Sequence, residues 1–116
     1  MRILWAGALV LTLLSCGNTS TSNPSACTQI QMVSVAVGFS PTPITVQKGG
    51  CVIFKNADPA ITHSVGNDPA KTSVQTISVS LLAPGYSSTQ ITLNLAGEID
   101  YMCTIHNSMK GVINVQ

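Results

Sequence analysis

Charged side chains are scarce in this chain of 116 residues: Asp, Glu, Lys and Arg together make up 8% of it, and its formal net charge is +1. Nucleic-acid-binding proteins need a basic stripe that neutralises phosphates, and no run of like charges is present here. The composition therefore gives no support for a nucleic-acid partner. The 4 carboxylates are scattered along the sequence, so they form no acid–base pair of the kind used in general catalysis.

Long apolar runs are also missing, apart from one at the N-terminus. Arg2 is followed by an apolar stretch, residues 3–14, which is too short to span a bilayer comfortably and is typical of a signal peptide. The stretch ends before Cys16 in a sequence that resembles the processing site of a bacterial lipoprotein. We expect residues 1–15 to be a lipoprotein-type signal peptide and Cys16 to carry the lipid. Residues 16–26 would then form a flexible tether.

This interpretation predicts an exported lipoprotein that is anchored to a membrane, on the periplasmic or otherwise extracytoplasmic face of the cell envelope. The alternative is an ordinary secretory leader, in which Cys16 has no special role. Both versions place the folded part of the chain outside the cytoplasm.

Helical periodicity is absent past the tether, where short alternating runs are separated by glycine and proline. In the first run, residues 29–39, alternation would put Val33, Val35, Val37 and Phe39 on one face. Short runs at this spacing predict an all-β domain, a β-sandwich, over residues 27–116. The other expected strands cover residues 44–47, 51–56, 63–66, 74–82, 88–95, 99–103 and 112–115.

Histidine is rare as well, since the chain contains only His63 and His106. Cys103, His106 and Met109 follow one another at intervals of three residues, and His63 lies far upstream. One thiolate, two imidazoles and one thioether are the ligands of a blue-copper electron-transfer site. A strand that ends at Cys103, with a tight loop after it, can aim three of these side chains at one point. Met109 could instead be a core residue, because methionine is a common filler of cores.

The stretch that begins at Tyr101, Tyr-x-Cys-x-x-His-x-x-Met-x-Gly, resembles the copper loop of cupredoxins of the plastocyanin and amicyanin type. The resemblance covers roughly residues 28–116 and implies a single Greek-key β-sandwich that binds one type 1 copper ion. The sequence departs from the family at Ser64, where asparagine is more usual, and at Ile105, where amicyanin has proline. These departures concern the tuning of the site. The implied copper ligands are His63, Cys103, His106 and Met109.

The same resemblance assigns roles to residues beside the ligands. Ser64 and Thr104 would cross-link the two ligand loops through hydrogen bonds, the alternative being ordinary hydroxyls that face water. His106 would bind the metal from the exposed end of the domain, so that its ring edge serves as the port for electrons. We expect Tyr101 to pack in the core, with its hydroxyl bonded to a backbone partner.

Two of the 4 cysteines have no role so far. With Cys16 assigned to lipid and Cys103 to metal, Cys27 and Cys51 remain. In a cupredoxin-like sandwich the strands that follow these two residues run side by side. In an exported domain such a pair is readily interpreted as a disulfide. Two unrelated buried thiols are the alternative.

The sequence therefore predicts an electron carrier rather than an enzyme, because a metal held by four protein ligands has no open position for a substrate. Its partners would be a redox protein donor and acceptor that bind transiently, and the carrier itself would be a monomer. Ile61 and Ile105 would belong to an apolar docking collar around the exposed imidazole. The alternative function is a copper-binding lipoprotein that stores or delivers copper, and a metal-free structural domain is a third option.

Overall fold

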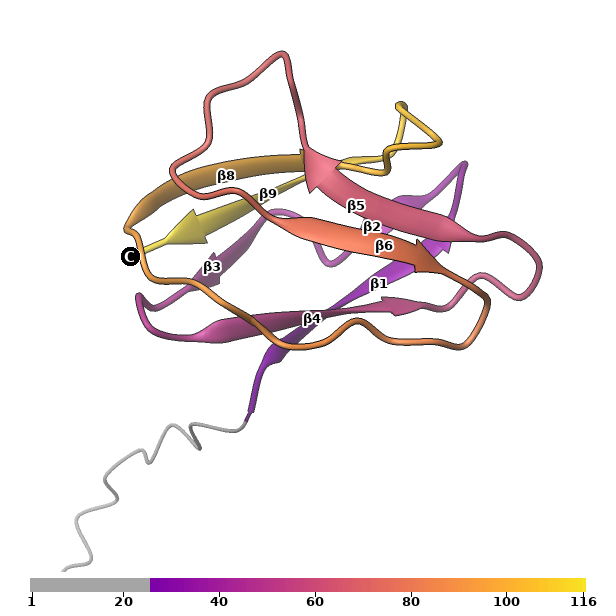
Figure 1. Ribbon diagram of the computed structural model, residues 1–116, viewed down its shortest axis with the longest axis horizontal. Helices are drawn as coiled ribbons and strands as arrows, with labels where there is room; N and C mark the ends of the chain where they lie inside the picture. Colours follow the sequence, from indigo (N-terminus) through magenta and orange to yellow (C-terminus); the bar gives the residue numbers. More distant parts are fainter. Residues whose placement is uncertain (1–25) are drawn as a thin grey trace, which may run out of the picture.

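The structure, a computed structural model, describes residues 26–116, and they form two β-sheets packed face to face (Figure 1). Sheet A has the strand order β2-β1-β4-β7, and sheet B has the order β3-β9-β8-β5-β6. This all-β sandwich confirms the predicted fold class. The described residues contain no helix that could cross a membrane. In sheet order, the strands are β2 (Gly38–Ser40), β1 (Thr28–Ser34), β4 (Cys51–Asn56) and β7 (Ile91–Thr92), then β3 (Ile44–Val46), β9 (Lys110–Val115), β8 (Gly97–Met102), β5 (His63–Asn67) and β6 (Ser78–Leu82).

The chain crosses repeatedly between the sheets, as in a Greek key. β1 pairs with β4 and β3 pairs with β9 in parallel, whereas the other pairs are antiparallel. A parallel pair needs a long connection, so these two pairings join segments that are distant in sequence. β8 and β9 form the one long hairpin, and its connection is the loop at residues 103–109. The hairpin therefore supplies a rigid base for that loop.

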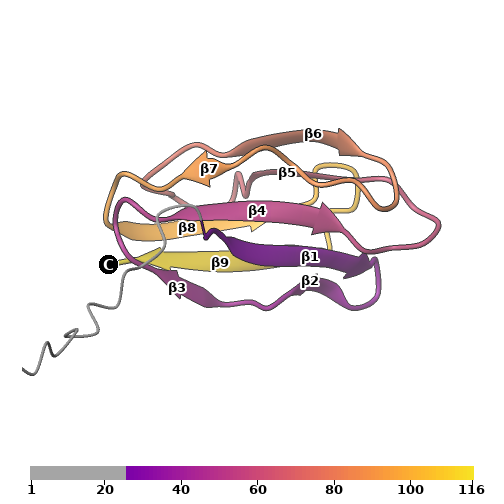
Figure 2. The same ribbon diagram turned by 90° about the horizontal axis from the view of Figure 1, so that it is seen from below.

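Four of the connections gather at one end of the sandwich, which we call the loop end (Figure 2). They are the β1–β2 turn, the β4–β5 loop, the β6–β7 loop and the β8–β9 loop. The turn between β3 and β4 and the C-terminus lie at the opposite end. Gly49 in that turn has φ 88°, a conformation that favours glycine, as its turn sequence predicts.

Alternating side chains from the two sheets fill the core. In β9, Gly111, Ile113 and Val115 point inward. Aromatic residues make up only 4% of the chain, yet three of them meet in the centre. The rings of Phe39 and Tyr101 are 4.7 Å apart between centroids, and those of Phe54 and Tyr101 are 5.3 Å apart, both edge to face. This geometry is favoured for aromatic pairs.

The first strand differs from its prediction. β1 ends at Ser34, and a turn follows before β2, so the run 29–39 is a hairpin and not one strand. The Ser34 hydroxyl accepts a hydrogen bond from the Val37 N–H (3.0 Å), and Gly38 has φ 84°; both stabilise the turn. The inward side chains of β1 are Ile30 and Met32. The prediction of one continuous face was therefore wrong: Val37 is 65% exposed, whereas Val35 packs against the core and Phe39 belongs to it.

The expected strands 74–82 and 88–95 are also much shorter than predicted, because other groups bind their backbone. The Asn67 side chain donates to the Gln75 carbonyl (2.9 Å) and accepts from the Ile77 N–H (2.9 Å). These bonds hold the chain out of the sheet until β6 begins at Ser78. After β7, Leu93 exchanges backbone bonds with the β3–β4 turn instead.

Candidate metal centre

Three of the predicted ligands converge at the loop end. His63 begins β5, while Cys103 and His106 lie in the β8–β9 loop. One donor atom from each residue lies within 4.8 Å of the other two. The Cys103 Sγ atom is 3.9 Å from His63 Nδ1 and 3.6 Å from His106 Nδ1. His63 and Cys103 are fully buried, whereas His106 is partly exposed.

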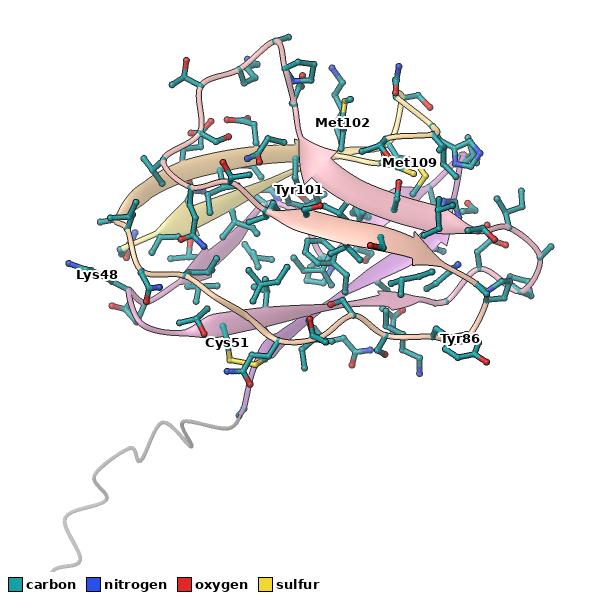
Figure 3. All side chains as sticks on the ribbon, viewed as in Figure 1. Lys48, Cys51, Tyr86, Tyr101, Met102 and Met109 are labelled. Carbon is teal, nitrogen blue, oxygen red and sulfur yellow. A yellow bond between two sulfur atoms is a disulfide. The ribbon has the colours of Figure 1, made fainter. Side chains whose placement is uncertain are left out.

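Met109 closes the same loop. The Cys103 N–H donates to the Met109 carbonyl (3.0 Å), and the Met109 N–H donates to the His106 carbonyl (2.9 Å). The Met109 side chain is 1% exposed and belongs to the hydrophobic core. Figure 3 shows it at the loop end, whereas Met102 projects from the outer face of sheet B. The loop is therefore compact and brings Met109 to the same end of the molecule as the three clustered residues. Axial ligation by Met109 stays a prediction.

The surroundings of Cys103 favour its thiolate, which is the form that binds metals. Burial alone would raise the pKa of the thiol. The Ser64 N–H, which lies 3.5 Å from Sγ, the neighbouring His63 ring and the Ile105 N–H outweigh it, and together they lower the pKa of Cys103 to about 6. A thiolate beside two imidazole nitrogens is a soft donor set that suits copper.

The two ligand loops are joined by side chains that follow the ligands. The hydroxyls of Ser64 and Thr104 are hydrogen bonded to each other, and the Thr104 N–H donates to the Ser64 Oγ atom (3.2 Å). Ser64 is buried, so this contact is shielded from water on one side. It ties the start of β5 to the loop after β8. The distance between His63 and Cys103 is therefore fixed by more than sheet pairing.

The hydrogen-bond partner of His63 was not predicted from the sequence. A ligating imidazole needs a fixed partner on its second nitrogen, and here the Asp58 Oδ2 atom lies 3.0 Å from His63 Nε2. Asp58 is 5% exposed. Hydrogen bonds from the Ala60 N–H, from His63 and from the Ile61 N–H hold the pKa of Asp58 below its ordinary value of 3.8, although burial opposes them. No periodicity or motif pointed to Asp58, which resembled an ordinary residue at the end of a strand.

Asn56 holds the loop that carries Asp58. Its side-chain amide donates to the carbonyls of Ile61 and Leu82, both at 2.8 Å. Its Oδ1 atom accepts from the Asp58 N–H at 2.9 Å. Asn56 is fully buried, so these bonds form without competition from water. The β4–β5 loop is therefore fixed both to itself and to β6.

The remaining predicted residues are not members of the donor cluster. Cys27 and Cys51 form a disulfide between the residue that precedes β1 and the first residue of its parallel partner β4, at the end opposite the loops. Ile61 and Ile105 are exposed at the loop end, at 41% and 50%. Cys16 lies outside the described residues.

The hydrogen bonding of the Tyr101 hydroxyl differs from the prediction. Tyr101 is fully buried as expected, but its hydroxyl has no hydrogen-bond partner among the described residues. Burial raises the pKa of Tyr101 to about 12, and the nearby Thr42 hydroxyl, which already accepts a bond from the Val112 N–H, only opposes this shift. Tyr101 faces Gly111 across the hairpin, and its ring and hydroxyl pack tightly against this glycine, where a larger residue would not fit.

Solved structures with the same fold are copper proteins. Part of a Cu-containing nitrite reductase (NirK) from Thermus scotoductus SA-01 superposes with a TM-score of 0.68 at 26% identity, over 78% of this chain and 22% of that chain. A purple cupredoxin from Nitrosopumilus maritimus gives 0.66 at 21% identity, over 77% of this chain and 99% of that one. An amicyanin variant in its reduced state gives 0.66 at 20% identity, over 78% and 83%. No curated protein sequence matches the chain.

The sequence profile of the copper binding proteins of the plastocyanin/azurin family matches residues 26–116, which is the whole of the described chain. The buried thiolate and the two converging imidazoles are donors that suit copper, so the cofactor of this protein is copper. The chain belongs to the plastocyanin/azurin family of copper-binding proteins.

Proposed function

We propose that this protein is a type 1 copper electron carrier that shuttles single electrons between extracytoplasmic redox partners. The observation that carries the proposal is the unequal exposure of the two imidazoles. His63 is fully buried, whereas His106 belongs to the same donor cluster and reaches the surface. A half-exposed ligand ring gives an electron a short path between the metal and a docked partner.

The protein around the site favours fast outer-sphere transfer. Copper, when bound, supplies the Cu(II)/Cu(I) couple. Asp58 holds the His63 ring, the Ser64 N–H faces the Cys103 thiolate, and the Ser64–Thr104 contact joins the two loops. Ligands fixed in this way move little between the two oxidation states. Together with the predicted axial bond of Met109, this closed donor set leaves no position for a substrate, which supports a carrier and not an enzyme.

Docking is proposed at the loop end, around His106. Ile61 and Ile105 are exposed there, one from the β4–β5 loop and one from the β8–β9 loop. The neighbouring Pro59 and Ala60 are exposed too, and Asp58 on the same loop is buried. Transfer should therefore depend only weakly on salt, because an uncharged collar provides little long-range steering. The partners would be transient redox proteins, and the carrier a monomer.

Ile61→Lys and Ile105→Lys should slow transfer to the partner without changing the spectrum of the protein. Leu95→Lys is the matched control, because Leu95 is similarly exposed (52%) but lies between β7 and β8, at the opposite end. The transfer rate could instead fall steeply between low and physiological ionic strength, with neither loop-end substitution affecting it. That result would mean that the partner docks on a charged surface elsewhere.

The leader supports a membrane-anchored location as part of the same proposal. Lipid on Cys16 would confine the carrier near membrane partners and raise its effective concentration. Cys16→Ala should abolish the attachment of lipid when the protein is expressed in a bacterial host with its leader, which mass spectrometry would show. A wild type that carries no lipid would mean that the leader works in another way.

Absorption of the copper-loaded protein tests the central proposal. An intense blue band that bleaches reversibly on reduction is expected, because the Cys103 thiolate supplies the charge-transfer transition. Cys103→Ser should abolish the band and leave a folded domain. A colourless protein that exchanges Cu(I) readily would instead support copper storage or delivery.

A further inference from the structure

The Asp58 carboxylate is the one acidic group that contacts a member of the donor cluster in the described part of the chain. The Nδ1 atom of His63 faces Cys103, and the Nε2 atom faces Asp58 at 3.0 Å. The carboxylate can only accept in this contact, so the hydrogen bond places the imidazole proton on Nε2. The lone pair on Nδ1 is then free for the metal.

Asp58 is held in place independently of His63. Its Oδ1 atom accepts hydrogen bonds from the backbone N–H groups of Ala60 (3.0 Å) and Ile61 (3.2 Å), and only Oδ2 faces the imidazole. Its own N–H donates to the fully buried Asn56 side chain. The carboxylate therefore does not follow the ring. It fixes the position and the orientation of the imidazole ring.

We propose that Asp58 is a positioning residue that fixes the Nε2-protonated form of His63 and lowers the reduction potential of the copper site. The proposal rests on the copper site of the proposed function. An imidazole that donates to a carboxylate is a more basic ligand than one that donates to a neutral group. Both the added basicity and the nearby negative charge stabilise the more highly charged ion, Cu(II), more than Cu(I).

The site makes Asp58→Asn an informative substitution. If the asparagine oxygen kept the bonds from Ala60 and Ile61, its NH2 group would face His63 Nε2 and favour the tautomer with the proton on Nδ1. If the amide flipped, its NH2 group would meet two backbone donors instead. Either arrangement weakens His63 as a ligand. Loss of such a carboxylate partner typically weakens metal binding about 10–100-fold.

The matched control is Asp68→Asn. Asp68 is 4% exposed, accepts a backbone N–H from Ala70 (2.9 Å) and pairs with Lys110 (3.1 Å), and it contacts neither imidazole nor Cys103. Both substitutions remove one negative charge from a similarly buried position. A difference between the two variants therefore reports the contact with His63 and not the change in net charge.

The experiment is voltammetry of the copper-loaded wild type, Asp58→Asn and Asp68→Asn, with Cu(II) affinity measured in parallel. We expect Asp58→Asn to lose at least tenfold in Cu(II) affinity relative to Cu(I), which raises the potential by about 59 mV for each factor of ten. Asp68→Asn should stay close to the wild type. Equal potentials in the two variants would overturn the proposal, whereas a wild type without a blue band would refute the proposed function instead.

Nuclear magnetic resonance of the reduced, copper-loaded wild type tests the proposal without any variant. The His63 Nε2 proton should be strongly deshielded and should exchange slowly, whereas the ring of the half-exposed His106 serves as an internal reference. A His63 proton that exchanges as fast as that of His106, or that lacks this deshielding, would overturn the assignment even if Asp58→Asn did not fold.

Discussion

Removing the disulfide should destabilise the domain strongly without affecting the copper site. The bridge joins Cys27 and Cys51 across a sequence separation of 24 residues. The chain-entropy estimate for a loop of this length is about 3.5 kcal/mol at 25 °C. For a domain of this size, that free energy corresponds to a fall in Tm of roughly 15–25 °C.

The assay compares Cys27→Ala/Cys51→Ala with the wild type by urea unfolding, both with copper bound. The bridge lies at the end of the sandwich opposite the loops, so the blue band and the reduction potential should be unchanged. Thiol counting on denatured, metal-free protein that lacks Cys16 should find one free thiol in the wild type, that of Cys103.

Three results would contradict this reasoning. A loss below about 1 kcal/mol would mean that the unfolded chain is already constrained, so that the chain-entropy estimate of the bridge does not apply here. Three free thiols in the wild type would mean that the bridge does not form. A shifted reduction potential would show instead that the two ends of the sandwich are coupled.

Three further predictions concern single residues. Tyr101→Phe should stabilise the protein by about 1 kcal/mol in urea unfolding at neutral pH, because it removes a buried hydroxyl without a partner. The pKa of Tyr101 is raised to about 12, so the wild type should also lose stability as the pH rises from 10 toward 12. The variant should not show this part of the loss. Bonds from the Ala70 N–H and from Lys110 lower the pKa of Asp68, so the stabilising effect of this carboxylate is present above pH 3.8 and is lost as the pH falls further. The difference in Tm between Asp68→Asn and the wild type should therefore disappear in acid. A difference in Tm that is the same at all pH values would contradict this expectation. Met109→Leu should keep copper and colour but raise the potential in voltammetry, because loss of a thioether destabilises Cu(II) more than Cu(I), and an unchanged potential would mean that Met109 is not axial.

The metal-binding loop was the easiest part to predict, because its chemistry is local in sequence. Cys103, His106 and Met109 are spaced so that one tight loop after a strand brings them together, and the structure shows such a loop on the β8–β9 hairpin. His63 was identified because histidine is so rare in this chain. Rare residue types at regular spacing therefore carried most of the information about the site.

Asp58 could not be found in the same way. Its contact with His63 depends on a turn in which the carboxylate accepts backbone N–H groups from Ala60 and Ile61 while its second oxygen faces the ring. Asp-Pro after a strand is also an ordinary way to end it. A ligating imidazole can turn its second nitrogen to a fixed partner or to solvent, and the sequence did not show that Asp58 would be that partner for His63.

The strand errors have a different physical origin. Alternation in residues 29–39 continues straight through a turn, so the pattern alone could not show that the chain reverses at Ser34. In residues 74–82 the Asn67 side chain competes with strand pairing for the backbone groups of the alternating run. As far as Ile77, these groups are bonded to the Asn67 side chain and not to a neighbouring strand. Periodicity predicts which side chains would share a face if a strand formed. It contains no information about the hydrogen bonds that decide whether the strand forms.

Both ends of the described chain are fastened to the same segment, the turn between β3 and β4. The disulfide joins Cys27 to Cys51, and the backbone of Gln116 is hydrogen bonded to Val46 and Lys48. Attachment of the domain through either end, whether to a fusion partner or to an electrode, would leave His106 facing away from the point of attachment. An electrode film made in this way should exchange electrons slowly with its support and readily with proteins in solution. A cysteine introduced at Asn107 or Ser108, beside His106, should reverse that preference.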